Sequence, residues 1–273
     1  MSKKPLTRDE QFLAKAAGDD VPMPKPLTRA QEFLERIVER LSGNVTEETL
    51  SDAIAPLNAS IAQLSRKTIQ FRHGKGTLTA TADGTNITWQ YGGQQARGNS
   101  CTFDVKSDNG LITLECDTIE SFIMRNNAVN KIDLSDLGGK ITNTLGLSNC
   151  TNITGDLSDL GGEITNSLSL AGCANITGDL SDLGGKIAGT LNLTNCANIT
   201  GVYSGPKYPK IFSMPKTAIT SADMDANLIN FAASGVKSGK FTATGMKRTA
   251  ASDDAVATLV ANGWTVSGLT KEG

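Results

Sequence analysis

The segment LSDLGGKITNTLGLSNCTNITGD occupies residues 134–156, and it is followed directly by LSDLGGEITNSLSLAGCANITGD (157–179) and LSDLGGKIAGTLNLTNCANITGV (180–202). In these segments LSDLGG, a cysteine and an Asn-Ile-Thr triplet all recur at one constant interval, the length of a segment. Three independent markers with one period in this range indicate a solenoid, in which each repeat packs on the next.

Each repeat also contains the pattern Leu-x-Leu-x-x-Cys-x-x-Ile, which begins at Leu145 in the first copy. One period upstream, FIMRNN (122–127) fits the same template and is expected to form a first, degenerate rung. The pattern resembles the core of leucine-rich repeats, with cysteine at the position that asparagine often holds. This resemblance implies a solenoid over residues 121–213, with one short strand in each repeat and the leucines of that strand in the core.

The repeat cysteines Cys150, Cys173 and Cys196 are expected to stack in a line, because neighbouring strands lie about 4.8 Å apart. They are interpreted as buried structural thiols; zinc is the alternative, but a line of equivalent positions is not a tetrahedron and no fourth ligand is near. The repeated Asp-Leu-Ser-Asp motif leaves open an acidic ladder for Ca²⁺, although its spacing matches no known calcium loop. We therefore predict no metal and no cofactor.

The outward side of the repeat strands is expected to be flat and rich in hydroxyl groups. Its candidate ligand-binding residues are Arg125, Ser148, Ser169, Asn192 and Thr194. This face has no aromatic anchors and one charge, so it lacks the residues that dominate protein–protein hot spots. It fits either a weak polar ligand, such as a host-surface glycan, or no ligand.

The preceding segment, 67–120, changes to a two-residue period that predicts strands. SCTFDVK (100–106) and LITLEC (111–116) are expected to form a hairpin around SDNG, with Cys101 opposite Cys116 as two thiols or a disulfide. The segment resembles the small PKD-like or immunoglobulin-like β-sandwiches that precede repeat arrays in bacterial and phage surface proteins. Trp89 stands where that family often has a tryptophan before a Gly-Asp-Gly turn, but the aspartate is missing here.

The N-terminal arm, 1–43, contains a duplication. Pro-Leu-Thr-Arg occurs at 5–8 and at 26–29, and each copy begins a helix with a capping box. The two helices are either solvated or form a repeated docking peptide, which we favour because two copies raise the effective concentration. The docking residues would be Leu6, Phe12, Leu13, Leu27, Phe33 and Leu34.

Residues 44–66 show an alternating spacing of four and three between apolar positions, which favours either a short oligomeric stalk or a monomeric helical linker. The seam residues would be Leu50, Ile54, Leu57, Ile61 and Leu64. At the other end, 214–273 is expected to be a small αβ cap, with helices beginning near Ser221 and Ser252 and strands at 240–244 and 264–266. AVATLVANGWTV (255–266) resembles the tail that closes leucine-rich-repeat proteins of gut-bacterial and phage origin.

Composition excludes several functional classes. The chain has 26 basic and 28 acidic residues, so no strong field indicates nucleic acid. No apolar run approaches the roughly 20 residues of a membrane span, and no hydrophobic stretch follows the first lysines, so synthesis in a cytosol is expected. The single histidine, His73, is interpreted as a solvated loop residue. No catalytic residue can be assigned, and we predict that the chain is not an enzyme.

Together these segments predict a multi-domain chain of mixed α and β structure: helical arm, stalk, β-sandwich, repeat solenoid and cap. The tandem arm resembles the N-terminal motifs of head-fibre and decoration-type proteins in phages and prophages of gut bacteria. This implies a non-enzymatic virion protein whose arm binds a capsid or other virion protein and whose repeats are displayed for adhesion and host attachment. A tail or baseplate receptor-binding protein and a bacterial leucine-rich-repeat interaction protein are the alternatives.

Overall fold

The computed structural model of the protein describes residues 66–272, which belong to one compact unit. The predicted docking arm, with its leucines and phenylalanines between Leu6 and Leu34, lies outside the described residues, as does the seam from Leu50 to Leu64. The described part is rich in strands and contains two α-helices, α4 (Ser221–Ala233) and α5 (Asp253–Ala261). This confirms the coarse expectation of mixed α and β structure.

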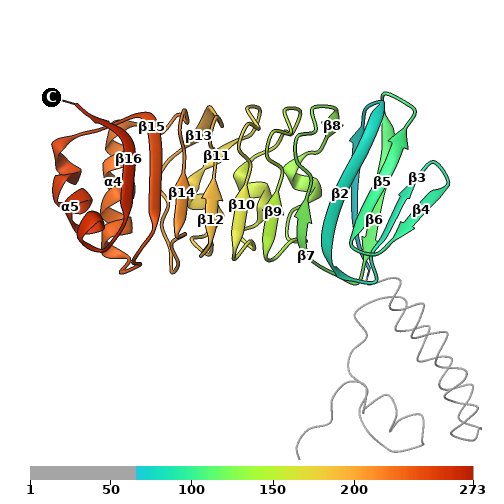
Figure 1. Ribbon diagram of the computed structural model, residues 1–273, viewed down its shortest axis with the longest axis horizontal. Helices are drawn as coiled ribbons and strands as arrows, with labels where there is room; N and C mark the ends of the chain where they lie inside the picture. Colours follow the sequence, from blue (N-terminus) through green and yellow to red (C-terminus); the bar gives the residue numbers. More distant parts are fainter. Residues whose placement is uncertain (1–65, 273) are drawn as a thin grey trace, which may run out of the picture. The chain divides into compact units, whose positions relative to one another are not determined.

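A nine-stranded sheet runs through the whole unit (Figure 1). Its strand order is β16-β15-β14-β12-β10-β9-β7-β2-β5, and neighbouring strands are parallel from β7 to β16. The strands are β2 (Gly76–Thr85), β5 (Ser100–Val105), β7 (Thr118–Ile123), β9 (Thr144–Gly146), β10 (Ser167–Ser169), β12 (Thr190–Asn192), β14 (Ile211–Ser213), β15 (Lys240–Arg248) and β16 (Thr265–Lys271). The segments expected to be sandwich, repeats and cap therefore share one sheet.

The central strands pair at a constant offset. Leu145 of β9, Leu168 of β10 and Leu191 of β12 are register partners, and all three are fully buried. These positions are separated by the repeat interval of the sequence. Each repeat therefore contributes one strand, here called a rung, and equivalent residues of successive repeats lie side by side in the sheet. Asn149 and Asn195, where these rungs turn away from the sheet, have φ of 59° and 63°. Asparagine suits this turn because it tolerates left-handed backbone.

The return side of each rung is a short 3₁₀ helix that an aspartate caps. The three helices are η1 (Leu134–Asp136), η2 (Leu157–Leu160) and η3 (Leu180–Leu183). Asp133, Asp156 and Asp179 each accept a hydrogen bond from the backbone N–H of the serine two positions further along the chain. A small parallel pair, β11 (Thr177–Asp179) and β13 (Asn198–Thr200), lies beside them.

A second sheet, of five strands, packs against the β2–β5–β7 end of the first. Its order is β4-β3-β6-β1-β8, with β1 (Lys67–His73), β3 (Thr88–Tyr91), β4 (Gln94–Arg97), β6 (Gly110–Cys116) and β8 (Asn130–Lys131). The rings of Phe71 and Trp89, from this sheet, lie 6.0 and 6.2 Å from the ring of Phe122 in β7. The three rings form the centre of a two-layer core.

The predicted hairpin of residues 100–116 is wrong. β5 pairs with β2, whereas β6 pairs with β1 and β3, so the SDNG segment crosses from one sheet to the other. The inward side chains were nevertheless chosen correctly, since Cys101 and Phe103 of β5 and Leu114 and Cys116 of β6 are all buried. Alternation identifies the buried face of a strand but not its partner, because a hairpin and a crossing between layers bury the same positions. Cys101 and Cys116 are free thiols.

The C-terminal helices and strands occur where they were expected. Phe212 of β14 and Phe241 of β15 pack on Phe231 of α4, with ring centroids 4.5 and 5.3 Å from it. The ring of Trp264 lies 5.6 Å from Phe231 as well. This aromatic cluster covers the end of the leucine core, which a further rung would otherwise cover.

Candidate functional site

The candidate ligand face is the outward side of the parallel strands, here called the hydroxyl face: Arg125, Ser148, Ser169, Asn192, Thr194 and Ser213. Arg125 and Ser148 follow β7 and β9, and Ser169 and Asn192 lie within β10 and β12. Each alternates with a buried leucine, phenylalanine or methionine, so strand geometry turns it outward. Arg125 is exposed, and the other five are half-buried.

The hydroxyl groups of this face bond to one another across rungs. The Oγ atoms of Ser148 and Ser169 lie 2.7 Å apart, and Thr194 donates to Oδ1 of Asn192 at 2.7 Å. Oγ1 of Thr194 also lies 3.0 Å from Oγ of Ser213. The structure thus joins Ser148 to Ser169 across rungs, and Asn192 and Thr194 of one rung to Ser213 of the next, whereas Arg125 is in neither group. Neither group contains a base that could activate a hydroxyl as a nucleophile.

Arg125 supplies the charge of the hydroxyl face. A Cβ placed on Gly146 would lie 3.6 Å from Nε of Arg125, so the guanidinium group lies across the rung at a position without a side chain. The face can therefore offer one cation beside neutral hydroxyl groups, which suits weak hydrogen bonding to a polar ligand.

Ser213 was missed by the sequence reasoning because its rung breaks the period. Thr190 of β12 pairs with Ser167 on one side at the repeat interval, but with Ile211 of β14 on the other side at a shorter one. A signal was nevertheless present: Phe212-x-Met214 repeats the Phe122-x-Met124 pattern of the first rung, and all four side chains are buried. The two ends of the array thus use the same pair of residue types.

The repeat cysteines connect neighbouring rungs. Each thiol is buried and donates to a backbone carbonyl of the preceding rung: Cys150 to Met124 at 3.2 Å, Cys173 to Leu147 at 3.0 Å, and Cys196 to Leu170 at 3.1 Å. Burial raises the pKa of Cys173 and of Cys196 to about 12. Such thiols are poor nucleophiles and poor metal ligands, because both roles need the thiolate.

The repeated aspartates also connect neighbouring rungs. Asp133 and Asp156 bond to the serine of their own rung and accept a second hydrogen bond, of 2.8 Å, from Thr154 and Thr177 of the next rung. Hydrogen bonds from these serine and threonine groups hold the pKa of both carboxyl groups below the ordinary value. Within residues 66–272, no three potential metal-ligating side chains come together, so nothing supports the calcium alternative.

His73 is not the solvated loop residue that the sequence suggested. It ends β1, pairs with Asn130 of β8 and is fully buried. Its Nδ1 donates to the carbonyl of Gly74 at 2.6 Å, and its Nε2 lies 2.8 Å from Nδ2 of Asn127. The interpretation failed because Gly74 and Lys75 resemble a loop, whereas β8, which covers the ring, belongs to a distant segment.

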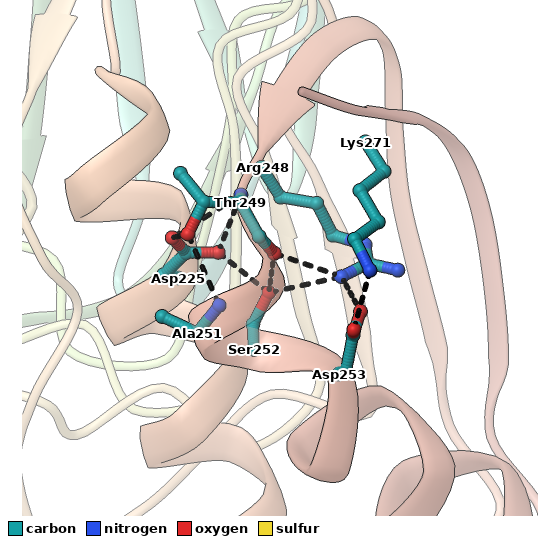
Figure 2. A network of polar contacts seen from close by, with 7 residues as sticks. All are labelled: Asp225, Arg248, Thr249, Ala251, Ser252, Asp253 and Lys271. Carbon is teal, nitrogen blue, oxygen red and sulfur yellow. Dashed lines mark hydrogen bonds and ion pairs between the residues drawn. The ribbon is translucent and has the colours of Figure 1, made fainter. Parts of the chain in front are cut away.

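A buried carboxylate, that of Asp225, lies in the cap (Figure 2). Asp225 of α4 accepts hydrogen bonds from the hydroxyl of Ser252 at 2.5 Å and from the hydroxyl and N–H of Thr249 at 2.6 and 3.0 Å. Beside it, Arg248 donates to Asp253 at 2.6 Å, and Lys271 approaches the same carboxylate. This network joins α4 to the segment before α5 and to β16, and Ser252 has no imidazole beside it that would make it a nucleophile.

Comparisons with protein families, with curated proteins and with solved structures found no match to the chain. No helix in the described part is long and apolar enough to cross a bilayer. Any functional assignment therefore rests on the sequence patterns and on the geometry described above.

Proposed function

We propose that the protein is a non-enzymatic display protein of a phage or prophage particle, a head fibre or capsid decoration. Its N-terminal arm (1–43) would bind a capsid or other virion protein, residues 44–66 would form a short stalk, and the remaining residues would be presented outward for adhesion. The virion location follows from the resemblance of the tandem Pro-Leu-Thr-Arg motifs to those of such proteins.

The observation that carries the display role is the continuous sheet from β5 to β16. A strand array bonded without interruption suits a stiff spacer, because every rung is held by backbone hydrogen bonds on both sides. The polar side chains described above serve this framework: the buried repeat thiols and the half-buried repeat aspartates join rungs, and the buried Asp225 joins the cap elements. The histidine of the chain, His73, is fully buried, and burial raises the pKa of the repeat thiols, so neither can act as an exposed base or nucleophile.

The finer fold assignment belongs to the same proposal. The rungs at a constant sequence offset, the inward leucines and the cysteine at the turn support a leucine-rich-repeat solenoid. The two facing sheets around Trp89 support a PKD-like or immunoglobulin-like module at its N-terminal end. In this arrangement, the hydroxyl face is the surface that a weak polar ligand on a host would meet.

The proposal is tested by immunogold electron microscopy of particles from the producing strain, with antibody against residues 66–272. Gold on particle heads is the expected result, and deletion of residues 1–43 should abolish it while the truncated protein still accumulates. Gold at the tail tip would instead indicate a receptor-binding protein. Unlabelled particles beside labelled cell surfaces would overturn the virion assignment in favour of a bacterial interaction protein.

A further inference from the structure

A shallow pocket of about 400 Å³ lies on the outer face of the five-stranded sheet, away from the hydroxyl face. The hairpin of β3 and β4 and the neighbouring strand β6 form it around the Gly92-Gly93 turn. Besides these glycines, the residues that line it are Gln90, Tyr91, Gln94, Gln95, Leu111 and Thr113. Of their side chains, those of Gln90, Gln95, Leu111 and Thr113 lie on this outer face, whereas the ring of Tyr91 packs on Phe103 in the core. Its volume falls at the lower end of the roughly 300–1,000 Å³ typical of small-molecule sites.

A row of hydrogen-bonding side chains crosses the sheet at this pocket; Gln95, Gln90 and Thr113 line the pocket, and Gln70 continues the row beyond it. Gln95 of β4 pairs with Gln90 of β3, and Gln90 pairs with Thr113 of β6. Thr113 pairs in turn with Gln70 of β1, which donates to its hydroxyl at 3.4 Å. Register partners lie about 4.8 Å apart, so four hydrogen-bonding side chains follow one another across the sheet. They point outward because Trp89, Ile112 and Leu114, which alternate with them, are buried.

The chemistry of the lining selects a neutral ligand. Every amide offers both a donor and an acceptor, and Thr113 adds a hydroxyl group with the same dual capacity. The lining contains no carboxylate and no cation, and the hydroxyl of Tyr91 is already engaged with the backbone N–H of Lys106 at 2.8 Å. Gln90 donates one of its two amide hydrogens to Glu115 at 3.4 Å, and Glu115 is paired with Arg66 at 3.6 Å, so its charge is compensated. The carbonyl oxygen of Gln90 accepts no hydrogen bond from the described residues.

The pocket also has an apolar edge and an open rim. Leu111 is 41% exposed on the same face of β6 as Thr113 and adds an apolar side chain to the polar lining. A Cβ placed on Gly92 or Gly93 would meet nothing within 4 Å, so the turn leaves the rim clear. A ligand with many hydroxyl groups and one C–H face would match both features.

We propose that this pocket binds a neutral saccharide, with the amides of Gln90 and Gln95 bonding to its hydroxyl groups and Leu111 contacting its C–H face. The site does not depend on the chain being carried by a particle, since it follows from the β3–β4–β6 surface alone. A shallow, open site of this kind is expected to bind one sugar unit weakly, with a Kd of about 1 mM.

The test is saturation-transfer NMR with the full chain and four separate probes: maltotriose, mannotriose, N-acetyllactosamine and the charged comparator sialyllactose. We expect signal from at least one neutral probe and a binding loss of about tenfold or more in the double variant Gln90→Ala/Gln95→Ala, equivalent to about 1.4 kcal/mol. Asn109→Ala is the matched control, because it removes an exposed amide in the SDNG turn outside the lining.

The outcomes separate the site from a folding defect and from the proposed function. Thermal unfolding of the double variant should match that of Asn109→Ala, since neither substitution removes a buried apolar group. Absence of signal from all three neutral probes, binding of sialyllactose alone, or equal binding by the double variant would each overturn the saccharide site. Particle labelling would be unaffected by any of these results.

Discussion

The amide of Asn127 donates a hydrogen bond of 2.8 Å to Nε2 of His73, and this contact fixes the imidazole as neutral. The orientation of the amide is determined by its other end, because Oδ1 of Asn127 accepts from the N–H groups of Val129 and Asn130 at 3.1 and 3.0 Å. Nδ2 must therefore face the ring, and Nδ1 of His73 carries the proton that is donated to Gly74. A proton on Nε2 would oppose the two amide hydrogens.

The first prediction concerns the pH dependence of stability. Burial lowers the pKa of His73 from 6.5, although its hydrogen bond to Gly74 opposes the change. The unfolded chain therefore takes up a proton on His73 at a higher pH than the folded chain does. The contribution of the neutral ring to the free energy of unfolding is fully present above about pH 6.5 and declines as pH falls toward the lower folded pKa. As the chain has one histidine, NMR titration of its ring measures this pKa directly. A folded pKa of 6.5 or above would contradict the prediction.

The second prediction concerns Asp225. Burial favours its neutral form, but hydrogen bonds from Ser252 and Thr249 and the charge of Arg248 outweigh this and lower its pKa. Asp225→Ala leaves two hydroxyl groups without their acceptor and should decrease the free energy of unfolding by about 2–3 kcal/mol in urea. Asp254→Ala, an exposed neighbour, should change it by less than about 0.5 kcal/mol.

The same carboxylate should contribute to acid unfolding. Since its folded pKa is below the ordinary value of 3.8, its contribution is complete above that pH and is lost as pH falls through the folded pKa. The wild type should therefore lose more stability than Asp225→Ala as pH falls from about 4 toward about 2. Parallel acid profiles of the two proteins would show that Asp225 does not contribute in this way.

The third prediction concerns the thiols. All five cysteines are buried and free, and burial raises the pKa of Cys101 to about 11. The native protein should react slowly with Ellman's reagent at about pH 8, because little thiolate is present and access is blocked. In denaturant without reductant, five thiols should react. A count of three would mean that a pair such as Cys101 and Cys116 is oxidised in solution.

The fourth prediction concerns the contact between rungs. Asp156 caps η2 and accepts a hydrogen bond from Thr177, so Asp156→Ala should cost about 1–2 kcal/mol of unfolding free energy. A double-mutant cycle with Thr177→Val should give a coupling energy of about 0.5–1.5 kcal/mol. Glu163→Ala removes only a surface ion pair with Lys186 and should cost no more than about 0.5 kcal/mol. Additive effects of the first two substitutions would refute the coupling.

The sequence predicted features that depend on local pattern. The inward leucines follow from period and alternation, and α4 and α5 follow from the residues predicted to begin them, Ser221 and Ser252, although the residue that caps α4 is Thr220. These patterns need no knowledge of distant contacts. The hydroxyl face was identified for the same reason, because outward positions alternate with buried ones.

Features that depend on which segments meet were not predictable in this way. The prediction of a hairpin over 100–116 was wrong because β5 and β6 pair with strands from other parts of the chain. His73 was misread because Asn127 and Asn130, which bury it, come from a distant part of the sequence. The pocket also depends on the strand order β4-β3-β6, since Gln90, Gln95 and Thr113 are brought together by strand pairing and have no common spacing in sequence.

The continuous sheet has a mechanical consequence. The strand order places β5 and β16 at opposite edges, about 38 Å apart at the usual strand spacing. A force that pulls β5 away from β16 acts across the strands, along their hydrogen bonds. Every pair of neighbouring strands then carries the same force and can separate in turn. The boundaries from β7 to β15 have three register pairs each, whereas β2–β5 and β15–β16 have six. Under tension the middle of the array should therefore extend first, while both ends keep their shape.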